Sequence, residues 1–198
     1  MSEAQNGGKK MEKAVMLSIR PKWVEKIVNG EKTIEVRKTR PKLKTPFKCY
    51  IYRTKGTVPH IINGKWVEMK VGGTVIGEFT CDAITRMNIC GFWDDSGKQL
   101  DNRLKDTCLT SEEFGNYLGE NVGYGWHISN LRIYDPLRDL GEFSPVCRYK
   151  NDDGSCQSRR VACSFQRYDY NHDGSINLVE CGRPLEHPPQ SWCYVEAM

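Results

Sequence analysis

The sequence predicts an α+β fold: a mixed β-barrel with flanking helices and a cysteine-rich insert near the C-terminus. Short runs of alternating or continuous apolar residues, typical of strands, occur at 14–19, 48–54 and 74–81. Two short segments, 21–28 and 111–118, carry apolar residues at helical spacing. After Pro145 the composition changes, because the following stretch holds four cysteines among polar and turn residues with little apolar content. A segment so poor in core residues usually needs a covalent or metal staple.

Length and composition favour a globular protein with one main domain and an elaboration. The chain has 198 residues, of which 38% are hydrophobic and 27% charged. We divide it into a disordered tail at 1–12, a main domain at 13–145, an insert at 146–187 and a closing strand at 188–198. No apolar run is long enough to cross a bilayer, and the polar start has no signal-peptide core. A cytoplasmic protein with no membrane partner is therefore expected, and its nine cysteines are expected to be thiols or ligands.

The most informative stretch is a short helix followed by a charged strand. The helix is predicted from the apolar face of Trp23, Val24, Ile27 and Val28, with Pro21 in its first turn. Gly30 suits a left-handed cap. In the strand, alternation buries two aliphatic residues and presents a hydroxyl, a carboxylate and a guanidinium on the other side. The aliphatic residues are Ile34 and Val36, and the polar ones are Thr33, Glu35 and Arg37.

Four later features complete the expected fold. Residues 86–107 are polar and suggest an insertion loop. Thr110 and Glu113 form a capping box for a helix whose apolar face packs on the barrel. Residues 123–135 contain one or more strands, and 194–196 return as an edge strand. Cys49 and Cys81 lie in apolar strand patterns and are expected in the core.

Positive charge is concentrated around the predicted helix and charged strand at 21–37. Residues 20–55 contain twelve lysines and arginines against three glutamates, with Trp23, Tyr50 and Tyr52 among them. Such a block fits a surface that contacts nucleic-acid phosphates. Within it, Lys32 and Arg37 flank Glu35 and can hold a polar ligand. The alternatives are solubilising lysines and an ordinary solvated strand.

Four blocks in order give a family resemblance. They are 16–40 with the pattern G-x-K-x-x-E-x-R, Gly77-Glu78-Phe79, 123–128, and 188–195. Together they resemble the longer phage and bacterial ASCH-domain proteins, which have the PUA-like fold. The resemblance implies a cleft between helix and barrel that takes RNA or a modified nucleoside. Lys32, Glu35 and Arg37 match the residues of that cleft. To these we add Lys38 and Arg40 of the basic block as binding residues and Trp126 as a stacking platform. A core tryptophan is the alternative for Trp126.

The resemblance also raises an enzymatic alternative. Some small ASCH proteins remove the acetyl group from N4-acetylcytidine with a lysine, a threonine three residues later and a distant glutamate. Lys32 matches the lysine, but Glu35 stands at the threonine position, and a carboxylate cannot replace that nucleophile. Glu78 and Asp106 are candidates for the distant acid, and Thr33 substitutes only if the backbone turns it inward. We therefore expect a nucleic-acid-binding module that needs no cofactor, with a hydrolase acting on a modified nucleoside or on RNA as the alternative.

The insert offers two structural metal sites. Residues 169–180 match an EF-hand loop, with calcium ligands at Asp169, Asn171, Asp173, Ser175 and Glu180 and with Tyr168 on the entering helix. Zinc is the competing ion, bound by Cys147, Cys156, Cys163 and Cys181, although no close cysteine pair is present. A loop rich in Asn, Asp and Gly, without metal, is the third possibility.

Overall fold

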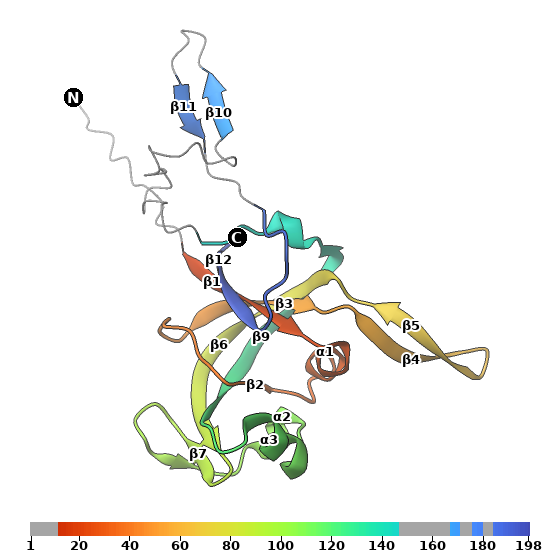
Figure 1. The fold of residues 1–198 in the computed structure, drawn as a ribbon, viewed down its shortest axis with the longest axis vertical. Coiled ribbons are helices and arrows are strands. Elements are labelled where there is room, and N and C mark those ends of the chain that lie inside the picture. The colour runs from red at the N-terminus through yellow and green to blue at the C-terminus, as the bar shows by residue number, and fades with distance from the viewer. Residues whose placement is uncertain (1–11, 147–166, 171–175, 180–183) are drawn as a thin grey trace.

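The computed structural model describes residues 12–146, 167–170, 176–179 and 184–198 (Figure 1). Its strands are β1 (Lys13–Ile19), β2 (Ile34–Arg37), β3 (Phe47–Arg53), β4 (Gly56–Ile62), β5 (Lys65–Val71), β6 (Thr74–Asn88), β7 (Gly91–Trp93), β8 (Gln99–Leu100), β9 (Gly123–Arg138), β10 (Arg167–Tyr170), β11 (Ile176–Val179) and β12 (Trp192–Glu196). The helices are α1 (Pro21–Val28), α2 (Leu104–Thr107), α3 (Ser111–Leu118) and the 3-10 turn η1 (Leu140–Glu142). A mixed α+β fold built mainly from sheet is therefore confirmed.

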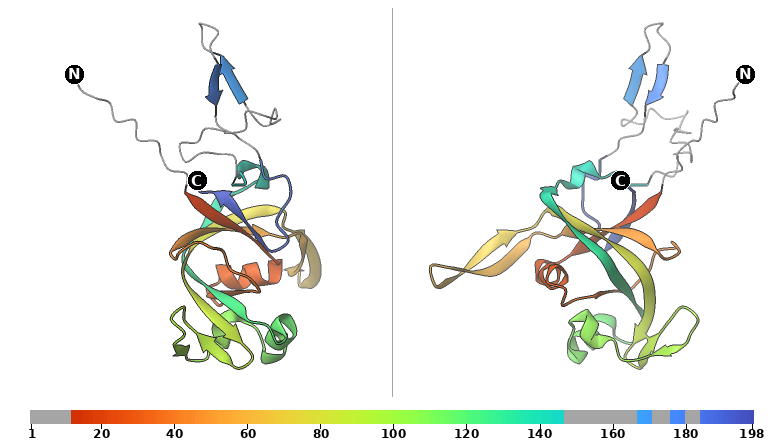
Figure 2. Two further views of the ribbon diagram at one scale, coloured as in Figure 1. Left: turned by 60° about the vertical axis from the view of Figure 1, so that its left-hand side comes forward. Right: turned by 180° about the vertical axis from the view of Figure 1, so that it is seen from behind.

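The main sheet is open, so the predicted closed barrel is wrong. Its strand order is β12-β1-β3-β6-β7-β8, and β9 branches from β6 to pair with β2. β1 runs parallel to β3, and the other pairs are antiparallel. β2 has four residues and pairs only with β9, so in the described part of the chain no strand joins β2 to β1 or β12. The long strands β6 and β9 curve the sheet around the core without closing it (Figure 2).

Core residues lie on both faces of this curved sheet. The largest cluster joins aliphatic residues of β1, β3 and β6 to Val24 and Ile27 of α1 and to Trp126 of β9. Cys49 and Cys81 are buried within it, as the sequence indicates. Burial raises the pKa of the Cys81 thiol to about 12, so this group stays a neutral packing residue.

Both predicted helices form, with the expected ends. α1 begins at Pro21, and Gly30, just beyond its C-terminus, has a φ of +76°, the left-handed conformation that glycine adopts most easily. α3 begins with the complete capping box of Thr110 and Glu113. The hydrogen bond from the Thr110 backbone N–H and the nearby Lys22 lower the pKa of Glu113. The return of the chain as an edge strand is also confirmed, because β12 pairs antiparallel with β1.

Two segments differ from the sequence expectation. Residues 86–107 are not a plain loop, because β6 continues to Asn88 and is followed by β7, β8 and α2. The β4–β5 hairpin, which we did not predict, projects from the body as a separate two-stranded sheet (Figures 1 and 2). No helix in the described segments is long and apolar enough to cross a membrane.

The predicted metal sites lie largely outside the described residues. Tyr168 and Asp169 belong to β10, which pairs antiparallel with β11, so the entering helix predicted at Tyr168 is wrong. Asn171, Asp173, Ser175 and Glu180 are not described, and neither are the four cysteines proposed for zinc. Calcium and zinc therefore both remain predictions for this segment.

Candidate functional site

A cavity of about 570 Å³ lies at the opening of the sheet. Its walls come from the end of β1, from α1, β2 and α3, and from the segment just before β12. This volume is within the range of small-molecule sites in proteins. The lining residues are Ser18, Ile19, Arg20, Trp23, Lys32, Glu35, Val36, Arg37, Thr54, Leu109, Glu113, Asn116, Tyr117, Gln190 and Ser191.

Lys32 is fixed by the turn after α1. Its backbone N–H donates to the Lys26 carbonyl at 2.9 Å, which folds the chain back under the helix. Its Nζ donates to the Thr107 carbonyl at 2.7 Å and lies 5.2 Å from the centre of the Trp23 ring. The side chain is 3% exposed, so this ammonium is held among fixed partners inside the protein.

Glu35 joins the two cations of the site. Its carboxylate lies 3.3 Å from Lys32 Nζ through one oxygen and 3.0 Å from Arg37 Nη2 through the other. Glu35 and Arg37 are only 6% and 7% exposed. The strand pattern places them on one side of β2, while Ile34 and Val36 pack into a separate apolar cluster on the other. The result is a buried row of cation, carboxylate and cation at the cavity.

Arg37 connects β2 to β1 across the opening of the sheet, where no strand of the described segments lies. Its Nη2 donates to the Ser18 carbonyl of β1 at 2.8 Å, and its Nη1 donates to Ser191 Oγ at 3.3 Å. The Ser18 hydroxyl in turn donates to the Pro189 carbonyl at 2.6 Å, which holds the segment before β12 against β1. Arg37 Nε is buried and has no partner among the described residues, so one donor of the guanidinium remains unsatisfied.

Two aromatic side chains stand at the walls of the cavity. Trp23 comes from α1 and Tyr117 from α3, and both are partly exposed. Burial raises the pKa of the Tyr117 phenol, which therefore carries its proton at neutral pH and can donate. Lys22 donates to Glu113 at 3.1 Å in an exposed ion pair that links the two helices. The cavity thus combines aromatic faces with a charged floor.

Two of the predicted binding residues lie beside the cavity instead of lining it. Lys38 is exposed, with its Nζ 5.2 Å from the centre of the Tyr117 ring. Arg40 is paired with Asp95 and lines a different depression formed by the loop 41–45. Both can contact only a ligand that extends beyond the cavity.

Trp126 is a core residue, so the predicted stacking platform is wrong. It is 0% exposed and packs edge-on against Phe47, with ring centres 5.7 Å apart. It stands opposite Glu35 in the β2–β9 ladder, so its indole belongs to the core beneath the charged row. A base cannot stack on it while these contacts persist. Trp23 and Tyr117 are the aromatic residues that a ligand can reach.

The structure does not bring the enzymatic candidates together. Thr33 is exposed and does not line the cavity. Glu78 lies on the other side of the sheet, where it accepts a hydrogen bond from Tyr134 at 2.7 Å. The carboxylate of Asp106, on α2, forms an ion pair with Arg103. The backbone carbonyl of Asp106 accepts a hydrogen bond from the Thr33 backbone N–H. Of the five candidates, only Lys32 and Glu35 line the cavity.

Sequence reasoning missed part of the lining. Ser18, Asn116, Tyr117, Gln190 and Ser191 line the cavity, yet none was predicted as a ligand contact. Gln190 and Ser191 lie in the block 188–195, which carries part of the family resemblance. For that block the sequence predicts only the closing strand. No sequence pattern singled out Asn116, because its role depends on how α3 is placed.

The chain is similar to one known protein family and to several solved structures. The sequence model of the ASCH domain matches residues 17–117. The solved structures to which the chain is similar include an ASCH protein from Zymomonas mobilis, with 17% identity, a TM-score of 0.44, and 61% of this chain and 69% of that chain covered. A serine-to-alanine mutant of that protein gives 18% identity and a TM-score of 0.43, with 64% and 72% covered. A search of curated protein sequences gives no match.

Proposed function

The chain belongs to the ASCH domain family, and from this premise we propose that it binds single-stranded RNA or a modified nucleotide in the cavity over Lys32, Glu35 and Arg37. The observation that carries the proposal is the buried row of two cations and a carboxylate beneath an opening walled by Trp23 and Tyr117. The site can offer charge, hydrogen-bonding groups and stacking surfaces to one ligand.

Each part of the cavity suits one part of a nucleotide. The guanidinium groups of Arg20 and Arg37, whose side chains line the cavity, favour an anionic or carbonyl oxygen. Glu35, Asn116 and Gln190 provide acceptors and amide groups for the edge of a base. Trp23 and Tyr117 offer ring faces for its plane.

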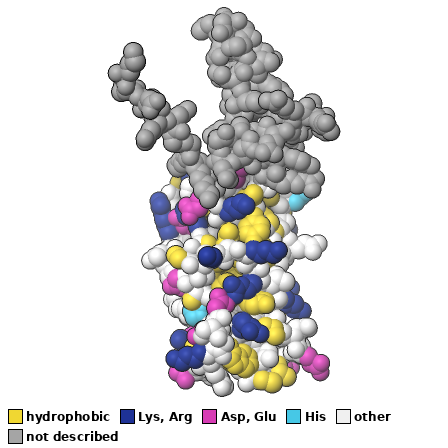
Figure 3. Space-filling view, turned by 90° about the vertical axis from the view of Figure 1, so that its left-hand side faces the viewer, with side chains coloured by type: hydrophobic (Ala, Val, Ile, Leu, Met, Phe, Trp, Pro, Cys, Tyr) yellow, Lys and Arg dark blue, Asp and Glu magenta, His cyan; other side chains and the backbone are white. Residues whose placement is uncertain are grey.

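The surface around the site supports a polyanionic ligand. On the face of the molecule drawn in Figure 3, lysine and arginine side chains lie among hydrophobic and acidic ones. Lys38 and Arg40 follow β2 directly, so phosphates next to a bound nucleotide have cations within reach. The basic composition of residues 20–55 agrees with this proposal.

A direct titration tests the function. We expect a labelled single-stranded RNA of about ten nucleotides to bind at low salt and a nucleoside monophosphate to compete with it. Tyr117→Ala should weaken RNA binding about tenfold because a stacking surface is lost, whereas Tyr117→Phe keeps the ring and should bind nearly as the native chain does. Absence of RNA and nucleotide binding by the native protein would refute the proposal.

A turnover assay separates binding from hydrolysis. Incubation with N4-acetylcytidine is expected to give no deacetylation above a protein-free control, because no threonine lies three residues after Lys32 and Thr33 does not line the cavity. Product release can be followed by chromatography. Deacetylation that disappears in Lys32→Ala would instead show that the site is catalytic, with a nucleophile other than Thr33 in its present position.

A further inference from the structure

The β4–β5 hairpin carries several hydrophobic side chains that are exposed to solvent. Of its fourteen strand residues only Val58 is buried. Its tight turn at Asn63 and Gly64 has φ values of 51° and 74°, which match a type I′ turn and fix the register. A two-stranded hairpin without a core is marginally stable in water. Exposed hydrophobic residues on such an element indicate a contact surface.

One face of the hairpin combines an apolar platform with a cation. Residues paired directly across an antiparallel ladder share a face. Ile61 is paired with Trp66, and Thr57 with Lys70, so these four lie on one side. Trp66 is 73% exposed and Ile61 is 56% exposed. Glu68 lies on the same side, opposite Pro59.

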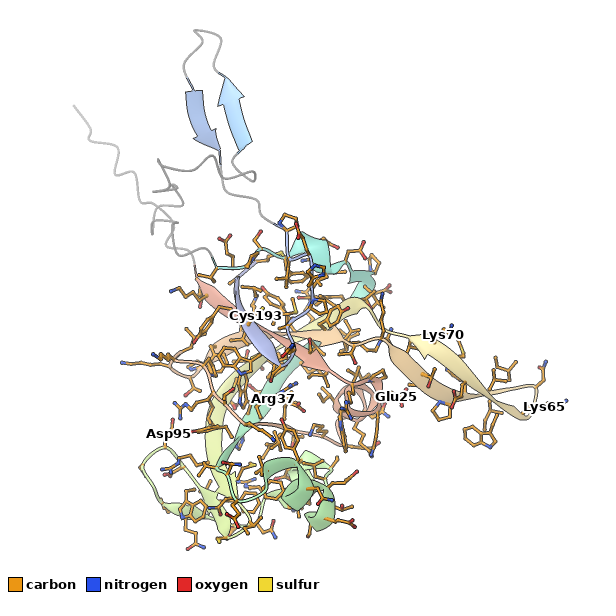
Figure 4. All side chains as sticks on the ribbon, viewed as in Figure 1. Glu25, Arg37, Lys65, Lys70, Asp95 and Cys193 are labelled. Carbon is orange, nitrogen blue, oxygen red and sulfur yellow. The ribbon has the colours of Figure 1, made fainter. Side chains whose placement is uncertain are left out.

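The lysines of the hairpin lie on both of its faces. Lys70, opposite Thr57, shares the face of Trp66, whereas Lys65, opposite Ile62, lies on the other face at the tip (Figure 4). With Lys55 just before β4, the projecting segment carries three lysines against Glu68. An aromatic surface with a lysine on the same face suits a base and its phosphate.

The end of the hairpin nearest the body of the protein adjoins the cavity. Thr54, two residues before β4, lines it. Gly56 packs so closely on Pro21 that an added Cβ would lie 3.1 Å from the proline ring, and Pro21 begins the helix that carries Trp23. Five strand steps separate Gly56 from Ile61, a span of roughly 17 Å. A stacked strand covers that span with about five nucleotides.

We propose that the β4–β5 hairpin is a second contact for the same single-stranded RNA, with a base stacked on Trp66 and Ile61 and a phosphate near Lys70. The inference rests on the proposed function of the cavity and adds to it a minimum ligand length. The cavity alone holds a nucleotide or a very short RNA, while the hairpin contributes only when the strand extends about five nucleotides from the cavity.

The test compares RNA lengths in the full chain. Trp66→Ala should weaken binding of an RNA of about ten nucleotides by about tenfold and leave the affinity for a nucleoside monophosphate unchanged. Glu68→Gln should strengthen binding of the longer RNA a few fold at low salt, because a negative charge beside the phosphates is removed. Ile89→Ala, at an exposed hydrophobic residue outside the hairpin, is the matched control and should have no effect.

The outcomes distinguish the two proposals. If Trp66→Ala leaves the affinity for the longer RNA unchanged while Tyr117→Ala lowers it, the hairpin contact is wrong and the cavity function stands. If the native chain binds a nucleotide but no RNA of any length, only the hairpin contact is wrong. If it binds neither, both proposals are wrong. If Trp66→Ala changes only the sedimentation of the protein alone, the hairpin is a contact between protein molecules and the RNA proposal is overturned. Thermal melting verifies that the variants are folded, as expected for so exposed a side chain.

Discussion

Glu35→Gln is expected to lower the free energy of unfolding by about 3 kcal/mol. The glutamine keeps the size of the side chain but removes the charge that lies 3.3 Å from Lys32 Nζ and 3.0 Å from Arg37 Nη2. Breaking a buried ion pair from one side costs about 3 to 5 kcal/mol, because the remaining charge stays buried without compensation. In a chain of this length the loss corresponds to a melting temperature lower by roughly 6 to 12 °C. Urea denaturation and thermal melting both measure it.

Two further variants show whether charge is the cause. Glu25→Gln, an exposed position on α1, should change the stability by less than about 0.5 kcal/mol. Adding Lys32→Met to Glu35→Gln should recover part of the loss, since one of the two uncompensated cations is then gone. If the double variant is instead less stable by the sum of the two single changes, the row is not electrostatically coupled and its stabilising role is wrong.

The local parts of this site could be predicted from the sequence because they depend on short-range rules. Helix spacing, Pro21 and Gly30 determine α1 and its end, and alternation places Glu35 and Arg37 together on β2. The capping box of α3 is likewise a pattern of neighbouring residues. These signals require no knowledge of which elements pack together.

The remaining features depend on tertiary packing. The sequence pattern of Trp126 is equally consistent with a core residue and with an exposed platform, and only the packing of Phe47 and Trp192 against it shows that it is buried. By helical spacing Tyr117 shares a face with Phe114 and Leu118 of α3, yet those two are buried in the core and Tyr117 lines the cavity. The predicted mixed barrel also does not close. Among the described residues β2 pairs only with β9, and Arg37 reaches from β2 to the Ser18 carbonyl of β1.

The packing also holds two cations beside a single carboxylate. Lys32 is held by the Thr107 carbonyl as well as by Glu35, and Arg37 by Ser18 and Ser191 as well as by Glu35. One carboxylate balances only one of the two charges, so the row keeps a net positive charge. A site of this kind is prepared for an anionic ligand before the ligand arrives.

Arg37→Ala is expected to weaken RNA binding by about 1 to 3 kcal/mol, or roughly five- to 150-fold. The substitution removes one of the two cations of the row, and it also releases Ser191 from its contact at the cavity wall. Fluorescence anisotropy with a single-stranded RNA measures the loss, at a temperature below the melting transitions of both proteins. Arg132→Ala, at an exposed arginine of β9 that does not line the cavity, is the control and should bind nearly as the native chain does.

The salt dependence of the same titrations identifies what Arg37 contacts. For single strands the logarithm of the binding constant falls with the logarithm of salt concentration by about 0.7 per phosphate contact. If Arg37 binds a phosphate, Arg37→Ala should reduce that slope by about 0.7, and Arg37→Lys should restore the slope but not the full affinity, because lysine lacks the planar fork. A weaker affinity with an unchanged slope would mean that Arg37 binds a base or sugar. Unchanged affinity in a correctly folded Arg37→Ala protein would exclude this cavity as the RNA site.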